Sequence, residues 1–171
     1  MAEEQLLNSV AGIVPLDVIQ TLNGMQFLQG LMDGRFPAAP IAALLGFYPT
    51  ELEPGRGVFS AIPDARHYNP LGTVHGGYIS TLLDSCMACA IHSKLRTGQS
   101  YTTLELKVNF VRAITAETGP VRAIGNVIQI GRQIATAEGR LVDSRDRLLA
   151  HATTTCLLFS LAARSLPSVS E

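Results

Sequence analysis

Hydrophobic residues recur every three or four positions near the N-terminus, which is the period of an amphipathic helix. This spacing predicts a helix over residues 15–33, because Pro37 and Pro40 interrupt the chain beyond it. A longer stretch with the same period begins after Gly77 and predicts a second helix that ends near Gly98. The apolar positions of the two helices are Val18, Leu22, Met25, Leu28 and Met32, and then Ile79, Leu82, Leu83, Cys86, Met87, Ala90 and Ile91.

The period changes to two after the second helix, where Leu104, Leu106, Val108 and Phe110 alternate with polar residues. Such alternation is typical of a strand with one buried face. Short connections favour antiparallel pairing, and a long helix with one apolar face needs a broad sheet to cover it. The sequence therefore predicts an α+β fold in which an antiparallel sheet packs on a long central helix. The strands are expected at residues 47–52, 57–62, 104–110, 121–130, 133–142 and 148–159, with a helical turn at 41–45.

Composition constrains the surface and the partners of the protein. Charged residues make up 16% of the 171 residues, against about 25% in typical domains, and 47% are hydrophobic, so we expect burial in an oligomer. The net charge of −1 and the lack of a basic stripe argue against a nucleic-acid partner. Acidic residues near the N-terminus and the lack of an apolar run of about 20 residues predict a soluble cytoplasmic protein without a membrane span.

Three cysteines cannot all form disulfides, and their number suits a reducing compartment. Cys86 and Cys89 lie within the predicted central helix, whereas a reactive C-x-x-C pair usually sits at a helix N-terminus. A zinc site would need two more soft ligands, and only His92 lies near. We therefore expect buried structural thiols and no metal.

The central helix carries one charged residue, Asp84, between Gly76 and Ser93. A surface helix normally carries several, so we expect this helix to be enclosed and Asp84 to be poorly solvated. Burying an unpaired carboxylate costs several kcal/mol, so Asp84 is expected to have either a salt-bridge partner or a functional role. At about 100° per residue, the face of Asp84 carries small and polar residues and the opposite face carries apolar ones. The two sets are Ser80, Thr81, Ser85 and Ala88, and Leu82, Leu83, Cys86 and Ala90.

His75, Gly76 and Gly77 stand where the central helix begins. The first backbone N–H groups of a helix have no intrahelical partners and point outward with the positive end of the helix dipole. Two glycines let a ligand approach this backbone closely, which suits an oxyanion hole. They suit a simple tight turn equally well.

The chain reads N-P-L-G-T-V-H-G-G-Y-I-S-T-L-L-D from Asn69 to Asp84. In this string, and in its element order over residues 47–159, it resembles the hotdog-fold acyl-CoA thioesterases, in the branch of the phenylacetate-degradation thioesterases. In that branch an Asn precedes H-G-G by six positions and an Asp follows the His by nine, as Asn69, His75 and Asp84 do here. The resemblance implies a hotdog domain, a sheet wrapped around the central helix, with an extra N-terminal helix outside it.

The same resemblance implies the roles of the site residues. The Gly76 N–H would polarise the thioester carbonyl, and Asp84 of the partner subunit would act as nucleophile or general base. Asn69 would place the carboxylate or the attacking water, and His75 would shape the loop. Thr102, at the start of the following strand, would assist. The sites would lie between the subunits of a homodimer or homotetramer, and a thioester is reactive enough to need no metal or cofactor.

Substrate contacts are expected around these positions. The acyl group would lie against helix and facing-strand residues, and a cation at the cleft mouth would bind the phosphates of coenzyme A. Arg132 is one candidate for that cation, and Arg112 or Arg122 is another. The expected substrate-binding residues are Gly77, Tyr78, Met87, Thr103, Phe110 and Arg132.

Hydrolysis of acyl-CoA to free acid and coenzyme A is the favoured function. A non-catalytic acyl-CoA-binding or sensing protein of the same fold is an alternative, against which the placement of Asp84 argues. A hydratase or dehydratase is another, but the remaining histidines show no matching motif. The expected organisation is a helical extension at 1–40, the thioesterase domain at 41–162 and a tail at 163–171.

Overall fold

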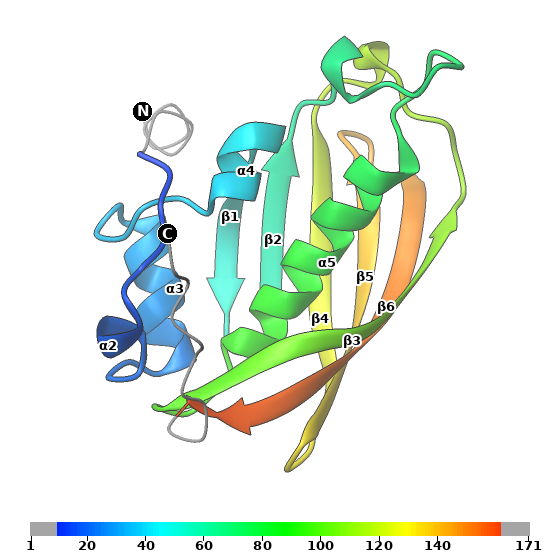
Figure 1. The fold of residues 1–171 in the computed structure, drawn as a ribbon. Helices are drawn as coiled ribbons and strands as arrows, with labels where there is room; N and C mark the ends of the chain where they lie inside the picture. The colour runs from blue at the N-terminus through cyan, green and yellow to red at the C-terminus, as the bar shows by residue number, and fades with distance from the viewer. Residues whose placement is uncertain (1–9, 162–171) are drawn as a thin grey trace.

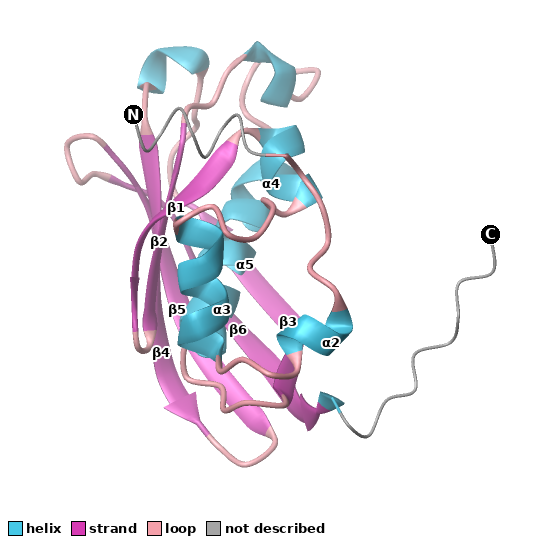
Figure 2. Cartoon of the chain, turned by 90° about the vertical axis from the view of Figure 1, so that its left-hand side faces the viewer, coloured by secondary structure: helices cyan, strands magenta, loops and turns pink. Residues whose placement is uncertain are grey.

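The computed structural model describes residues 10–161. A six-stranded antiparallel sheet, in the order β1-β2-β4-β5-β6-β3, curves around the long helix α5 (Figure 1). The shorter helices lie on the same side of the sheet as α5 (Figure 2). This confirms the expected α+β fold with a sheet around a central helix. The helices are α2 (Leu16–Ile19), α3 (Gly24–Met32), α4 (Pro40–Leu45) and α5 (Gly76–His92), with 3₁₀ turns η1 (Ala65–His67) and η2 (Ala116–Thr118). The strands are β1 (Phe47–Glu53), β2 (Arg56–Ala61), β3 (Gln99–Phe110), β4 (Val121–Ile130), β5 (Ile134–Asp143) and β6 (Leu148–Ser160).

Helix α5 packs closely on the sheet because three glycines form a row beneath it. Gly57 of β2 pairs with Gly125 of β4, which pairs with Gly139 of β5. A Cβ atom added to Gly125 would lie 2.5 Å from the backbone carbonyl of Cys86, and one added to Gly139 would lie 3.0 Å from Met87 Cγ. The face of α5 that was expected to be apolar is buried against this sheet, at 0–1% exposure for Leu82, Leu83, Cys86 and Ala90.

Strand β3 departs from regular alternation at Leu104. Between Thr103 and Glu105 the strand advances two residues while its partner β6 advances one, so Leu104 is the extra residue of a β-bulge. Because the bulge shifts the faces by one position, Thr103 before it and Leu106 after it both face inward. The expectation that Leu104 and Phe110 are buried was wrong, since they are 57% and 56% exposed.

The N-terminal helix expected over residues 15–33 is two helices, α2 and α3. Asn23 restarts the helix through a capping box, in which its side chain accepts a hydrogen bond from Gln26 N at 2.9 Å. In return Gln26 Oε1 accepts a bond from Asn23 N at 3.0 Å. Gly24 N, the first residue of α3, donates to Leu95 O at 3.0 Å. The break between α2 and α3 thus lets the N-terminus of α3 pack on the segment that follows α5.

The central helix ends at His92, earlier than expected from the pattern up to Gly98. Ser93 follows the last helical residue, and its hydroxyl donates to Ala90 O at 2.6 Å and accepts from Gly55 N at 2.7 Å. Gly98, with φ of +77°, then turns the chain into β3. The tail expected at residues 163–171 lies outside the described part of the chain.

Candidate active site

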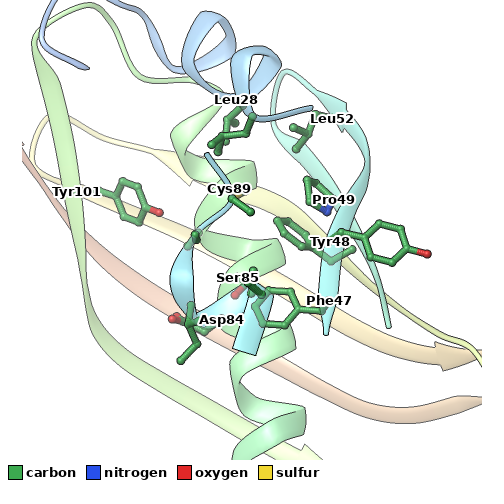
Figure 3. Close-up of a pocket in the computed structure, with 17 residues that line it drawn as sticks. Leu28, Phe47, Tyr48, Pro49, Leu52, Asp84, Ser85, Cys89 and Tyr101 are labelled. Atoms are coloured by element: carbon green, nitrogen blue, oxygen red, sulfur yellow. The ribbon is translucent and has the colours of Figure 1, made fainter. Parts of the chain in front are cut away.

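Asp84 lies at one end of an apolar pocket of about 210 Å³ (Figure 3). The pocket runs between α5, β1 and the N-terminal helices, and Asp84 is the only formally charged residue that the described part of the chain contributes to its lining. On α5 the lining continues with Ser85, Ala88 and Cys89, which agrees with the small and polar face expected around Asp84. An ionisable group thus faces a space suited to an apolar ligand.

Among residues 10–161 the Asp84 carboxylate has one hydrogen-bond donor, the hydroxyl of Thr103, whose Oγ1 lies 3.1 Å from Asp84 Oδ1. Burial raises the pKa of Asp84, and the hydrogen bond from Thr103 opposes part of that rise. No Lys, Arg or His in residues 10–161 forms an ion pair with it. Within the described part of one chain, Asp84 therefore has no salt-bridge partner.

Thr103, and not Thr102, is the threonine that contacts Asp84. Thr102 is exposed on the other face of β3. The bulge at Leu104 explains the difference, because an uninterrupted alternation through Leu106 would have placed Thr102 inward. Thr103, expected only as a substrate-binding neighbour, is therefore the one placed to assist the carboxylate.

The N-terminus of α5 leaves one backbone donor open. His75 caps the helix, since its Nδ1 accepts a hydrogen bond from Gly77 N at 2.8 Å. This bond requires that the proton of the neutral imidazole be on Nε2. The Gly76 N–H, in contrast, has no hydrogen-bond partner between residues 10 and 161. Beside it lies the ring of Phe110, whose Cζ would be 3.1 Å from a Cβ atom added to Gly76.

Asn69 fixes the loop that leads into α5. Its Oδ1 accepts hydrogen bonds from Leu71 N at 2.9 Å and Thr73 N at 3.3 Å, and its Nδ2 donates to Thr73 Oγ1 at 2.9 Å. Asn69, Gly76 and Phe110 also line an open cleft of about 290 Å³, separate from the Asp84 pocket. The chain thus gathers Asn69, Gly76 and Phe110 in one place, and Asp84 with Thr103 in another.

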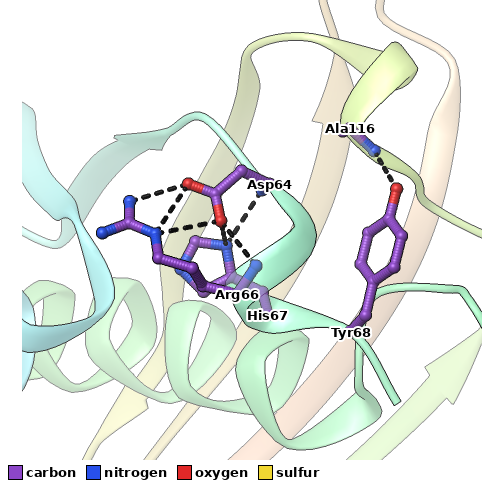
Figure 4. A network of polar contacts seen from close by, with 5 residues as sticks. All are labelled: Asp64, Arg66, His67, Tyr68 and Ala116. Atoms are coloured by element: carbon purple, nitrogen blue, oxygen red, sulfur yellow. Dashed lines mark hydrogen bonds and ion pairs between the residues drawn. The ribbon is translucent and has the colours of Figure 1, made fainter. Parts of the chain in front are cut away.

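A polar network holds the preceding turn, η1, in place (Figure 4). Asp64 accepts hydrogen bonds from Arg66 N at 2.8 Å and from the Arg66 guanidinium at 2.7 Å. The Arg66 hydrogen bonds lower the pKa of Asp64 to about 2. Tyr68 Oη accepts a bond from Ala116 N at 2.7 Å, and His67 O accepts one from His75 N at 2.7 Å. The backbone before Gly76 is therefore connected to η1 through His67 and to η2 through Tyr68.

Five of the six residues expected to bind substrate, all but Thr103, lie away from Asp84 and its pocket. Met87 is 0% exposed on the sheet side of α5. Tyr78 is 5% exposed, its ring stacks 4.1 Å from that of His67, and burial raises its pKa to about 12. Arg132 belongs to the turn between β4 and β5, at the end of the sheet opposite the start of α5 (Figure 1). Gly77 lies at the start of α5 and Phe110 lines the separate cleft, so none of the five contributes to the wall around Asp84.

The pocket walls include residues that the sequence did not single out. They come from the N-terminal helices and from β1 and β3, and only their apolar character was visible in the sequence. Which face of each element turns toward Asp84 depends on how the helices dock. The most informative of them are Leu28, Leu31, Ala42, Phe47, Leu52 and Tyr101.

The cysteines, all within the described chain, are free thiols. Cys86 is buried, as expected, whereas Cys89, also expected to be buried, is half-buried in the wall of the Asp84 pocket, and Cys156 is buried. Burial raises the pKa of Cys89 to about 12, which disfavours its thiolate form. Residues 10–161 hold no cluster of His, Cys, Asp or Glu that could bind a metal ion. No helix in that range is long and apolar enough to cross a membrane.

The two candidate groups are far apart within one chain. Gly76 and Asp84 are eight positions apart on the same helix, which corresponds to about 12 Å of rise. Reacting atoms must approach to about 3–3.5 Å. A single copy of α5 therefore cannot present both groups to one carbonyl.

Comparison with known proteins identifies the family. The profile of the thioesterase superfamily matches residues 71–150. A Pseudomonas aeruginosa protein named "Putative esterase PA0474" is 31% identical over 120 residues, which cover 69% of this chain and 87% of the relative. The chain belongs to the thioesterase superfamily.

Solved structures agree with this assignment. A thioesterase family protein from Silicibacter pomeroyi is 28% identical with a TM-score of 0.70, over 81% of this chain and 99% of its own. A phenylacetic acid degradation-related protein from Ralstonia eutropha is 27% identical with a TM-score of 0.70, over 77% and 98%. The PaaI protein of E. coli, at 20% identity, shares the fold with a TM-score of 0.69 over 80% and 94%. The expected hotdog fold is thereby confirmed.

Proposed function

We propose that this protein is an acyl-CoA thioesterase, which hydrolyses a thioester to the free acid and coenzyme A. The observation that carries the proposal is the Asp84 carboxylate, with a raised pKa and one hydroxyl donor, at the end of an apolar pocket. An acyl chain fits an apolar pocket, and a desolvated carboxylate at its end is a suitable base or nucleophile. The names of the relatives, an esterase and thioesterases, support the same reaction class.

In this proposal Asp84 either takes a proton from water as the water attacks the carbonyl carbon, or attacks that carbon itself. The carbonyl oxygen becomes an oxyanion that accepts a hydrogen bond from the Gly76 N–H. Collapse breaks the C–S bond, and coenzyme A leaves as a thiolate. In the first route the thiolate takes the proton that Asp84 removed from water, and the acid is released. In the second route the acyl group stays on Asp84 as a mixed anhydride, which water then hydrolyses to the free acid and the Asp84 carboxylate, with a proton from that water going to the thiolate. Thr103 holds the carboxylate, while Asn69 and His75 hold the backbone at Gly76. The reaction needs no cofactor or metal.

The proposed site combines Asp84 of one subunit with Gly76 of another, because one chain keeps them about 12 Å apart. Strand β3 supports such a dimer, since it is an edge strand of the sheet. It exposes Leu104, Phe110 and the following Val111, and unpaired edges with apolar side chains favour pairing with another chain. Thr103, the partner of Asp84, lies on this strand. A homodimer or a homotetramer built from it would place the carboxylate near the interface.

The test of activity measures release of free thiol from acetyl-, octanoyl-, benzoyl- and phenylacetyl-CoA. Wild-type protein should release coenzyme A from at least one, and Asp84→Asn should lose about 10²- to 10⁴-fold in kcat. Glu138→Gln, which makes the same carboxylate-to-amide change at an exposed position of β5 outside the pocket, serves as the control and should stay near the wild-type rate. Near-normal rates for Asp84→Asn would contradict its role. Binding without any thiol release would favour the non-catalytic alternative.

Shared sites are tested by mixing two inactive variants. Asp84→Asn and Gly76→Pro each disable one half of the proposed site. Subunits that exchange between them form mixed dimers with one intact site, so activity should return to about a quarter of the wild-type value. Failure to recover activity, with exchange confirmed by mass spectrometry of differently tagged chains, would place both groups in one subunit.

A further inference from the structure

The pocket beside Asp84 is closed by a part of the chain that precedes the family match. Leu28 and Leu31 of α3 and Ala42 of α4 line it opposite α5. The superfamily profile begins only at residue 71. This wall therefore lies outside the part of the chain that the superfamily profile matches.

Helix α3 is packed as a fixed wall. A Cβ atom added to Gly24 would lie 1.7 Å from His92 O, so the backbones of α3 and α5 touch there. The ring of Phe27 stacks on that of His92 with centroids 4.9 Å apart, and the Gly24 N–H is bonded to Leu95 O. Leu28, one residue further along α3, is 1% exposed. The contacts that Gly24 and Phe27 make with His92 fix α3 on α5, and this holds the Leu28 side chain in position.

Leu28 and Asp84 mark opposite ends of the pocket. In Figure 3, Leu28 and Leu52 lie together at one end, Asp84 and Ser85 lie at the other, and Cys89 lies between. From Asp84 to Cys89 the helix rises about 7.5 Å. An acyl group with its carbonyl at Asp84 would pass Cys89 and end against Leu28.

The size of the pocket restricts what can fit. An apolar cavity of about 150 Å³ is enough to hold a benzene molecule, and pockets for drug-sized ligands begin at about 300 Å³. The Asp84 pocket, at about 210 Å³, lies between these values. An aryl, arylacetyl or medium-length acyl group matches it, and a long fatty acyl chain does not.

We infer that Leu28 is the end wall of the acyl pocket and sets the largest acyl group that the enzyme accepts, while Ala42 sets its width. This inference rests on the proposed thioesterase activity. It assigns the choice of acyl group to the N-terminal helices and leaves the chemistry to α5 and β3.

The test compares kcat/KM for acetyl-, butanoyl-, hexanoyl-, octanoyl- and dodecanoyl-CoA. Leu28→Ala should move the preferred acyl group to a longer one, with a change of about 10-fold or more in the ratio of long to short substrates. Ala42→Leu adds volume to the wall and should shift the ratio the other way. Leu28→Met, which nearly conserves volume, should shift it least.

A second readout does not depend on catalysis or on a single variant. Binding of S-hexyl- and S-dodecyl-CoA thioethers, which cannot be hydrolysed, is measured by calorimetry with wild type, Leu28→Ala and Ala42→Leu. Leu141→Ala, which truncates an equally buried leucine of β5 outside the pocket, controls for loss of stability. The Ala42→Leu result alone decides the question if Leu28→Ala does not fold.

The outcomes separate the inference from the proposed function. Hydrolysis with an unchanged length profile in both variants would overturn the role of the N-terminal wall and leave the thioesterase assignment intact. The variants can also shift the length dependence of thioether binding while no acyl-CoA is hydrolysed. That result would overturn the thioesterase assignment and support the role of the N-terminal wall. Equal binding of both thioethers by all variants would overturn the inference.

Discussion

Thr103 Oγ1 donates a hydrogen bond of 3.1 Å to Asp84 Oδ1, and this bond joins β3 to the middle of α5. It exists because the bulge at Leu104 turns Thr103 inward. The hydrogen bond favours the ionised carboxylate, whereas burial disfavours it. Thr103 thus helps to set the pH at which Asp84 ionises.

Replacement of Thr103 by Val should raise the pKa of Asp84 further, because the one donor to the carboxylate is lost. If the ionised form is the active one, the acidic limb of the kcat/KM profile should move to higher pH. A pH–rate profile with the best acyl-CoA measures this shift. Thr102→Val, on the exposed face of the same strand, is the matched control. Equal profiles for the two variants would argue against a positioning role for Thr103.

Gly76→Pro tests the backbone donor directly. Proline fits the first position of a helix and lacks an N–H, and His75, with φ −64° and ψ 137°, has the extended conformation that a following proline requires. The loss of one oxyanion donor should lower kcat by about 10²-fold or more. Gly76→Ala adds a similar Cβ beside Phe110 but keeps the N–H, so the difference between the two variants isolates the donor. Similar rates for both would mean that steric crowding, and not the N–H, matters.

Acid should destabilise the packing of α3 through His92. Its ring lies between those of Phe27 and Tyr101, and burial lowers its pKa from 6.5 to about 4. Between these values the unfolded chain binds a proton that the folded chain does not. The stability contributed by neutral His92 is therefore present above pH 6.5 and is lost as the pH falls toward 4, with a slope of up to about 1.4 kcal/mol per pH unit.

Urea denaturation over this pH range checks the expectation. His92→Phe keeps a ring in the stack without a titrating group and should show a shallower loss of stability on acidification. His151→Phe, at an exposed position of β6, should behave as the wild type. A wild-type slope in the His92→Phe variant would show that other groups cause the acid sensitivity.

The glycine row predicts unequal effects of the same substitution. Gly125→Ala would place a Cβ atom 2.5 Å from the backbone of α5, which cannot move without shifting the helix, so we expect a loss of about 3 kcal/mol or more in unfolding free energy. Gly139→Ala meets the flexible side chain of Met87 at 3.0 Å and should cost less, about 1 kcal/mol. Thermal and chemical unfolding of the two variants compare them. A larger loss for Gly139→Ala would contradict the close approach at Gly125.

The sequence predicted the fold and the environment of Asp84 because both follow from local patterns. A helix with one charge among small residues implies an enclosed carboxylate, and hydrophobic spacing assigned the sheet-facing side of α5. The break at Asn23 was missed because apolar residues continue at helical spacing across a capping box. The inward position of Thr103 was missed because the bulge is set by pairing with Thr155 and Cys156 of β6, which lie 50 and 53 positions from Glu105 and Thr103.

The pocket wall could not be predicted for a related reason. Leu28 is apolar in the sequence, but its place opposite Asp84 depends on the backbone contact between Gly24 and His92. The positions of Met87 and Tyr78 could not be predicted for the same reason. Both belong to α5, but they lie on faces of the helix that do not line the Asp84 pocket. Tertiary docking, and not local propensity, decides which apolar residues meet a ligand.

The spacing of Gly76 and Asp84 along α5 has a consequence for kinetics in solution. If each site is completed by a second chain, free monomers are inactive and the rate follows the population of dimers. At concentrations near the dimer dissociation constant, diluting the protein twofold should then lower the rate more than twofold, by mass action. The enzyme would switch itself off on dilution, with no inhibitor and no change in any side chain.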